Sequence, residues 1–143
     1  MDLAEQQWQF STVYQAPVDV QLDSGRADGK FGHWQGRFEL GEDDPLYVDM
    51  DGDGDQDVVA SMSFSSEIAP ETYQWVGTTW FVWLNDGDCL TQLPYPLAGS
   101  GDCDTRVRSV TAADGGGVVV EEAQMAWQSV CARGPSIEVT RTV

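Results

Sequence analysis

One acidic segment constrains this chain more than any other: residues 49–57 read Asp-Met-Asp-Gly-Asp-Gly-Asp-Gln-Asp. Five carboxylates stand at every second position, and glycines separate the central ones. Like charges about 5 Å apart repel by roughly 1–3 kcal/mol per pair, and glycine lets the backbone curl so that oxygens converge. A hard divalent cation, which takes about 6–8 oxygen ligands, removes this repulsion. The segment therefore predicts a calcium loop.

The spacing gives each carboxylate a position in that loop. Asp49, Asp51, Asp53 and Asp57 occupy positions 1, 3, 5 and 9 of a calcium loop, and Asp55 at position 7 is expected to offer its backbone carbonyl. All five aspartates are therefore candidate Ca²⁺ ligands.

The flanks of the loop argue against an EF-hand. An EF-hand needs a bidentate Glu at position 12, where this chain has Ala60. Apolar and polar residues alternate at period 2 over residues 46–50 and again over 58–64. Such alternation predicts strand–loop–strand rather than helix–loop–helix.

Residues 47–59 resemble the FG-GAP/VCBS repeat, the calcium-loop unit of integrin-type β-propellers and many bacterial surface proteins. Residues 80–84 and the following Asn-Asp-Gly-Asp resemble the next hairpin of such a unit. The resemblance implies Ca²⁺ at the five aspartates and covers about 40 of the 143 residues. The loop occurs once, whereas a propeller needs several blades. The chain is therefore more similar to small bacterial envelope lipoproteins that carry one such loop in a compact β domain.

Length and composition predict one globular domain over residues 1–143, because 41% of the residues are hydrophobic and 22% charged. The 24 acidic and 7 basic residues give a net charge of −17. Nucleic acid and anionic membranes are therefore excluded as partners, since no basic patch can neutralise phosphates. Solubility is the simplest role for this acidity, and basic partners remain open.

The sequence also bears on the compartment. No stretch approaches the roughly 20 apolar residues of a membrane span, and residues 1–5 lack the basic and apolar regions of a signal peptide. The alternatives are a cytosolic chain and a mature fragment of an exported one. We favour the second, because millimolar calcium lies outside cells and fills even weak loops.

The three cysteines leave the disulfide pattern open. Cys89 and Cys103 bracket a Pro- and Gly-rich loop that a disulfide would close, and Cys131 offers a second partner to either of them. A closed loop of about 15 residues contributes roughly 3 kcal/mol on the chain-entropy model.

The rest of the chain is predicted to form β-strands. Period-2 alternation marks segments near residues 7–14, 18–22, 34–40, 118–127 and 137–139. The apolar run 80–84 predicts a central strand covered on both faces. Turn signals stand at Asp28-Gly29, Asp86-Gly87, 114–117 and 133–135, and only residues 121–130 offer a helical alternative. The fold class is therefore all-β, a single antiparallel domain built as a sandwich, meander or open barrel.

Catalysis finds little support in the sequence. His33 is the only imidazole, and it is expected to be a structural or exposed residue at the start of a strand. The obvious carboxylates are assigned to one cation. We therefore predict that the protein is not an enzyme.

Six tryptophans offer a second hypothesis. Trp34 and Trp80 are expected in the core, whereas Trp75 and Trp83 could lie on an exposed face and stack on sugar rings.

The sequence thus predicts a calcium-binding, non-enzymatic β domain with a structural metal loop, secreted, periplasmic or lipid-anchored at the cell envelope. The alternative is a module that binds a glycan or a protein at the cell surface through exposed Trp and Tyr. The partner and the oligomeric state stay open.

Overall fold

The structure of the chain is a computed structural model that describes residues 2–12, 15–101, 105–126, 134 and 136–143. Within these residues every regular element is a β-strand, apart from one short 3-10 helix, η1 (Leu3–Glu5). All the strand pairs are antiparallel. The predicted all-β, antiparallel fold class is therefore confirmed.

The strands form three sheets. The largest sheet contains β3 (Arg26–Phe31), β4 (Trp34–Leu40), β6 (Asp57–Ala69), β7 (Thr72–Asn85) and β8 (Leu90–Gln92), with β5 (Leu46–Val48) beside β6 and β9 (Ala98–Gly101) beside β7. The second is the hairpin of β1 (Gln7–Thr12) and β2 (Gln15–Gln21). The third contains β10 (Arg106–Ala112), β11 (Val118–Gln124) and β12 (Ile137–Thr142).

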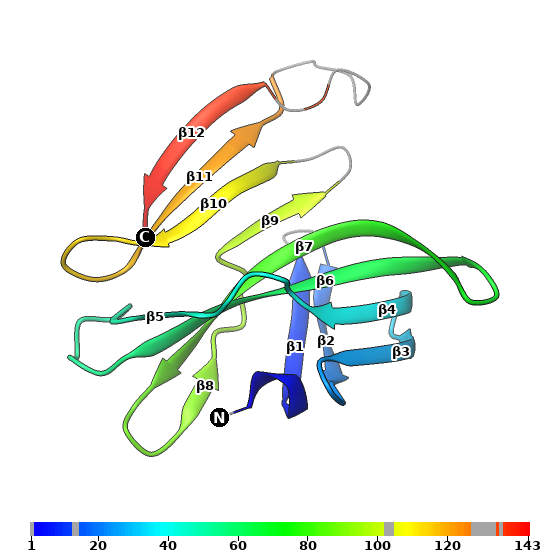
Figure 1. Cartoon of the computed structure of the whole chain (residues 1–143), viewed down its shortest axis with the longest axis horizontal. Coiled ribbons are helices and arrows are strands. Elements are labelled where there is room, and N and C mark those ends of the chain that lie inside the picture. Colours follow the sequence, from blue (N-terminus) through cyan, green and yellow to red (C-terminus); the bar gives the residue numbers. More distant parts are fainter. Residues whose placement is uncertain (1, 13–14, 102–104, 127–133, 135) are drawn as a thin grey trace.

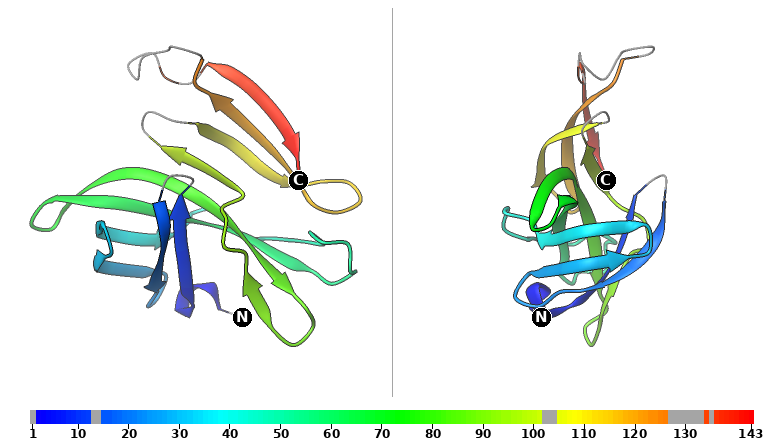
Figure 2. Two further views of the ribbon diagram at one scale, coloured as in Figure 1. Left: turned by 180° about the vertical axis from the view of Figure 1, so that it is seen from behind. Right: turned by 90° about the vertical axis from the view of Figure 1, so that its right-hand side faces the viewer.

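The long β6–β7 hairpin runs across the middle of the molecule (Figure 1). Strands β9 to β12 lie on one side of it, and β1 to β4 lie on the other. The largest sheet curls like half a barrel, and the β1–β2 hairpin lies alongside its β3–β4 end, as the right-hand view of Figure 2 shows. Both small sheets are therefore placed against the same central hairpin.

Two hydrophobic clusters explain this arrangement, one on each face of the β6–β7 hairpin. Phe81 and Trp83 belong to the first cluster, which includes Trp8 and Phe10 of β1. Val82 belongs to the second, which includes Val118 and other residues of β11. Successive residues of a strand point to opposite faces, so the apolar run 80–84 supplies both clusters. The predicted central strand, covered on both faces, is confirmed.

The first turn signal was wrong. Asp28 and Gly29 lie inside β3, where they pair with Arg37 and Gly36 of β4. The chain turns instead at Gly32-His33, and Gly32 has a left-handed φ of 60°. Cross-strand pairing thus overrides a local Asp-Gly preference. The turns at residues 86–87 and 114–117 are where the sequence places them.

Other expectations fall partly outside the described residues. The helical alternative for 121–130 is wrong as far as Gln124, because β11 continues to that residue, and residues 127–133 lie outside the description. The turn signal at 133–135 also falls mainly outside it. The Cys89 thiol is free and exposed, so the two pairings that include Cys89 are not formed. Cys103 and Cys131 lie outside the described residues.

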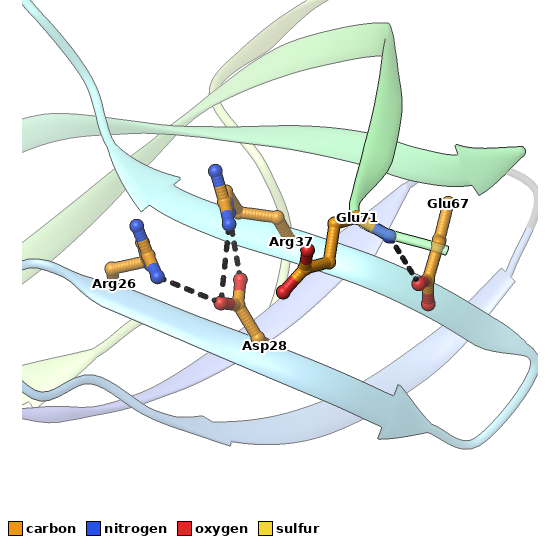
Figure 3. A network of polar contacts seen from close by, with 5 residues as sticks. All are labelled: Arg26, Asp28, Arg37, Glu67 and Glu71. Carbon is orange, nitrogen blue, oxygen red and sulfur yellow. Dashed lines mark hydrogen bonds and ion pairs between the residues drawn. The ribbon is translucent and has the colours of Figure 1, made fainter. Parts of the chain in front are cut away.

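A polar network joins β3 to β4 on the sheet face that does not contact the first cluster. Figure 3 shows two arginines that converge on Asp28: Arg37 Nε lies 2.8 Å from one carboxylate oxygen, and Arg26 lies 3.0 Å from the other. The hydrogen bond from Arg37 is the main reason that the pKa of Asp28 lies below its ordinary value of 3.8. Arg37 also lies 4.1 Å from the centre of the Tyr73 ring.

Acid should remove the stabilisation that this network provides. A carboxyl group whose pKa is lowered by folding stabilises the protein above its unfolded-state pKa, and the effect is lost as pH falls through the folded-state value. The pair is partly exposed, so its contribution is small. We expect Asp28→Asn to lower the melting temperature by about 1–3 °C at pH 7, and the difference from wild type to disappear towards pH 2.

Asp44→Asn is the matched control, because Asp44 is exposed and none of the ion pairs among the described residues includes it. Melting curves from pH 2 to 7 compare the three proteins. Parallel curves for wild type and Asp28→Asn across this range would contradict the assignment.

Candidate metal centre

The acidic segment forms the loop between β5 and β6. Val48, the last residue of β5, pairs with Asp57, the first residue of β6, so the pairing of the two strands fixes both ends of the loop. Gly52 and Gly54 adopt left-handed φ values of 83° and 96°, which glycine reaches without steric cost. The predicted strand–loop–strand arrangement is confirmed.

Three carboxylates of the segment gather at one point. Oxygens of Asp49, Asp51 and Asp57 all lie within 4.8 Å of one another. Two oxygens that ligate one Ca²⁺ at about 2.4 Å can be at most about 4.8 Å apart. The three aspartates could therefore hold one metal ion between them. Asp49 and Asp57 lie at the two ends of the loop and Asp51 lies in its first turn. An ion here would therefore bridge the two ends of the loop.

The other two predicted ligands are not part of this group. Asp53 accepts a hydrogen bond from the backbone N–H of Asp55 through Oδ1, at 2.8 Å. The Asp55 carboxylate lies beside Gly87, with Oδ2 3.7 Å from where a Cβ on that glycine would be. Of the five aspartates, the structure thus gathers the carboxylates of three and leaves two outside.

The exposed part of the loop turns its own N–H groups towards its carboxylates. Asp49 accepts hydrogen bonds from Gly52, at 2.7 Å to Oδ1, and from Gly54, at 3.1 Å to Oδ2. Asp51 accepts one from Asp53 at 3.2 Å. Two carboxylate oxygens offer about four lone-pair positions. Acceptor capacity therefore remains for a cation.

Asp57 differs from the other aspartates because its side chain is fully buried. Its Oδ2 accepts a hydrogen bond from the backbone N–H of Met50 at 2.7 Å, and its Oδ1 accepts one from Asn85 at 2.8 Å. A buried charge is tolerated only when it is paired or hydrogen-bonded. The side-chain amide of Asn85 also donates to the carbonyl of Gln56 at 3.2 Å. Asp57 therefore joins the start of the loop to the end of β7.

A second contact joins the loop to the third sheet. The backbone carbonyl of Asp49 accepts a hydrogen bond from the N–H of Gly117 in the β10–β11 turn, at 2.8 Å. A Cβ on neighbouring Gly116 would lie 2.9 Å from the same carbonyl oxygen, so glycine permits this close approach. Neither Asn85 nor Gly117 was predicted from sequence to contact the loop. The signal that could have found them is their position, because Asn85 precedes the Asp86-Gly87 turn and Gly117 ends the turn at 114–117.

None of the ion pairs among the described residues includes an aspartate of the loop. His33, the candidate base considered from sequence, is exposed in the β3–β4 turn, as expected. Within the described part of the chain, no ion pair therefore offsets the repulsion among the loop carboxylates.

Comparison of the chain with protein-family models, with curated proteins and with solved structures finds no match. No helix among the described residues has both the length and the apolar character needed to cross a membrane.

The buried carboxylate should matter for stability even when no ion is bound. Asparagine at position 57 would keep one acceptor oxygen and place an N–H₂ group against the second backbone donor. One buried N–H, from Met50 or Asn85, would lose its partner. We expect Asp57→Asn to cost about 1–3 kcal/mol in urea unfolding with EDTA present.

Asp53→Asn is the matched control in the same loop. Its side chain is exposed and keeps an oxygen for the Asp55 N–H, so we expect a change within about 0.5 kcal/mol in EDTA. Equal unfolding free energies for Asp57→Asn and Asp53→Asn would show that the buried contact does not stabilise the fold.

Proposed function

We propose that this chain is a calcium-binding β domain of the cell exterior, in which one Ca²⁺ in the β5–β6 loop stabilises the fold. The observation that supports the proposal is the gathering of three carboxylates, from Asp49, Asp51 and Asp57, within the span of one ion. Three negative charges at this distance repel one another strongly. A bound cation turns that repulsion into attraction.

The donor chemistry supports calcium over other metals. Oxygen ligands suit Ca²⁺, Mg²⁺ and Mn²⁺, whereas zinc and copper sites use His and Cys. Mg²⁺ demands near-ideal octahedral geometry, whereas Ca²⁺ accepts irregular sets of 6–8 oxygens. A loop whose carboxylates lie at alternate positions, with further backbone carbonyls and water available, fits the larger ion. The resemblance of residues 47–59 to FG-GAP/VCBS loops supports the same choice.

The role of the ion is structural in this proposal. Asp57 and Asp49 would both ligate the ion, and both also contact other strands: Asp57 through Asn85 of β7, and Asp49 through Gly117 of the β10–β11 turn. Binding would therefore order the loop, β7 and the third sheet together. The protein performs no catalysis in this account. It acts at the cell envelope or in the secreted fraction, where millimolar calcium keeps the site filled.

Calcium should raise the stability of the whole domain. A ligand that binds only the folded state stabilises it by about 2.7 kcal/mol at one hundred times its dissociation constant. We expect calorimetric titration with CaCl₂ to show binding near one ion per chain, and the melting temperature to be several degrees higher in millimolar calcium than in EDTA. Equal melting temperatures in the two solutions would contradict the proposal.

A pair of variants tests which carboxylates take part. Asp51→Asn removes one of the three gathered carboxylates, and we expect it to weaken Ca²⁺ binding by about tenfold or more. Asp55→Asn removes the same charge from the same loop but keeps the backbone carbonyl, and its carboxylate lies outside the group. Calorimetry should show a clearly smaller loss for Asp55→Asn. An equal loss would mean that only the total charge of the loop matters.

A further inference from the structure

The β6–β7 hairpin has a second surface that the metal does not use. Beyond Val59 and Val82, which pack in the second cluster, the outer face of the hairpin carries hydroxyl and aromatic side chains. The register pairs them across the two strands: Ser61 with Trp80, Ser63 with Thr78, and Ser65 with Trp75. Side chains directly opposite in an antiparallel pair lie on the same face. A row of serines on β6 therefore runs beside two tryptophans and the threonine between them on β7.

A β-bulge turns Trp75 to this face. Phe64 pairs with Gly77 and Ser65 pairs with Trp75, so Val76 is an extra residue on β7. Val76 packs against the first cluster, on the inner face. Without the bulge, strict alternation from Trp80 and Thr78 would place Val76 outside and Trp75 inside. The bulge therefore exchanges an aliphatic side chain for an aromatic one on the outer face.

The Trp75 ring is held in place although it faces solvent. Its Nε1 donates to the Thr78 hydroxyl at 3.2 Å, and that hydroxyl also forms a hydrogen bond with the Ser63 hydroxyl at 2.8 Å. The residue is still 44% exposed. An aromatic ring held by its polar edge presents an apolar face with little conformational freedom left to lose on binding. Such a ring is prepared for stacking.

These residues line a groove of about 780 Å³. Ser61, Ser63 and Ser65 lie along it, Trp75 and Trp80 lie on the β7 side, and Glu39 lies on the β4 side. Arg26, Glu42 and Asp43 also border it. The three alternate positions of β6 from Ser61 to Ser65 extend about 13 Å, so the groove admits an extended ligand. On this face the buried residues of the second cluster end at Val59 and Val82, and Trp80 packs against them.

We propose that this groove binds a neutral oligosaccharide chain, with one sugar ring stacked on Trp75 and its hydroxyls hydrogen-bonded to Ser63, Ser65 and Glu39. Sugar rings combine apolar C–H faces with hydroxyl edges. The groove combines an aromatic face with serine hydroxyls, which donate and accept hydrogen bonds, and with carboxylates, which accept them. The proposal does not depend on the metal, because none of the loop aspartates lines the groove.

Charge selects against anionic occupants and against a second copy of the chain. The net charge of −17 and the acidic groups Glu39, Glu42 and Asp43 around the groove disfavour anionic polysaccharides. A second copy of the chain would bring the same negative charge to the interface, so self-association through this face is also disfavoured.

Affinity electrophoresis tests the proposal directly. The full chain is run in native gels that contain dextran, mixed-linkage β-glucan, xylan or galactomannan, with an alginate gel as the anionic counterpart. We expect at least one neutral polysaccharide to retard the protein and alginate not to retard it. The result should be the same in calcium and in EDTA, at a temperature where the chain is folded in both. Persistence in EDTA separates this result from the outcome of the calcium experiments.

Variants locate the binding surface. Trp75→Ala should lower the association constant by about tenfold or more, and Thr78→Val, which frees the Trp75 ring, should lower it by a smaller factor. Tyr95→Ala is the control, because Tyr95 is 81% exposed and does not line the groove. Melting curves check that each variant is folded.

Three results would overturn the proposal. The first is no retardation in any of the neutral gels. The second is equal retardation of wild type and Trp75→Ala. The third is a dimer, seen by sedimentation, that Trp75→Ala dissociates, because a second copy would then occupy the groove.

Discussion

The hydrogen bonds of the buried Asp57 carboxylate hold together both ends of the acidic loop and the end of β7, which lies 28 residues further along the chain. Its two oxygens accept N–H groups from Met50 at the start of the loop and from Asn85 at the end of β7, while its backbone begins β6. A fully buried charge requires such partners. The position of this one carboxylate therefore fixes where the loop leaves the sheet and how the other acidic groups approach it.

The remaining loop geometry follows from this anchor. With Asp57 fixed, Asp49 and Asp51 bring their oxygens to within 4.8 Å of it, although like charges oppose that approach. The Asp49 carbonyl meets Gly117 of the β10–β11 turn, so the acidic group lies where the central hairpin meets the third sheet. An ion at this place would act on two sheets at once, which explains how a short loop could influence the stability of the whole domain.

The two faces of the β6–β7 hairpin differ in which residues they carry along the length of the strands. At the end near the acidic loop, both faces carry apolar residues and both are covered. Towards the other end, the inner face stays apolar while Ser61, Ser63 and Ser65 replace aliphatic residues on the outer face. Ser61 is still buried, whereas Ser63 and Ser65 are half-buried. The bulge at Val76 then adds Trp75 to the polar face. The groove is thus a consequence of where the second cluster stops.

Local features of the fold could be predicted from sequence, because alternation and glycine positions act over a few residues. The loop between two strands and the doubly covered run 80–84 are of this kind. The failures involve partners far along the chain. Asp28-Gly29 is a good turn sequence, but pairing with Arg37 and Gly36 extends the strand through it.

The exposure of the tryptophans also could not be predicted from local sequence. Trp75 and Trp83 stand an even number of residues apart, and strict alternation would place both on one face. The bulge at Val76 separates them: Trp75 is 44% exposed, whereas Trp83 is only 5% exposed and lies against Trp8. The contacts of Asp57 with Asn85 and of Asp49 with Gly117 likewise depend on tertiary packing. Spacing in the loop suggested four carboxylate ligands and the backbone carbonyl of Asp55, and could not show which three carboxylates gather.

Amide hydrogen exchange is the sharpest test of the proposed ion, because it reports on the individual N–H groups that contact the loop. We expect calcium, relative to EDTA, to slow exchange at the amides of Met50, Gly52, Gly54, Asn85 and Gly117 by about tenfold or more. The slowing should follow the same calcium concentration dependence as the calorimetric titration. Unchanged exchange at these amides in saturating calcium would contradict the claim that an ion in the acidic loop joins the two sheets.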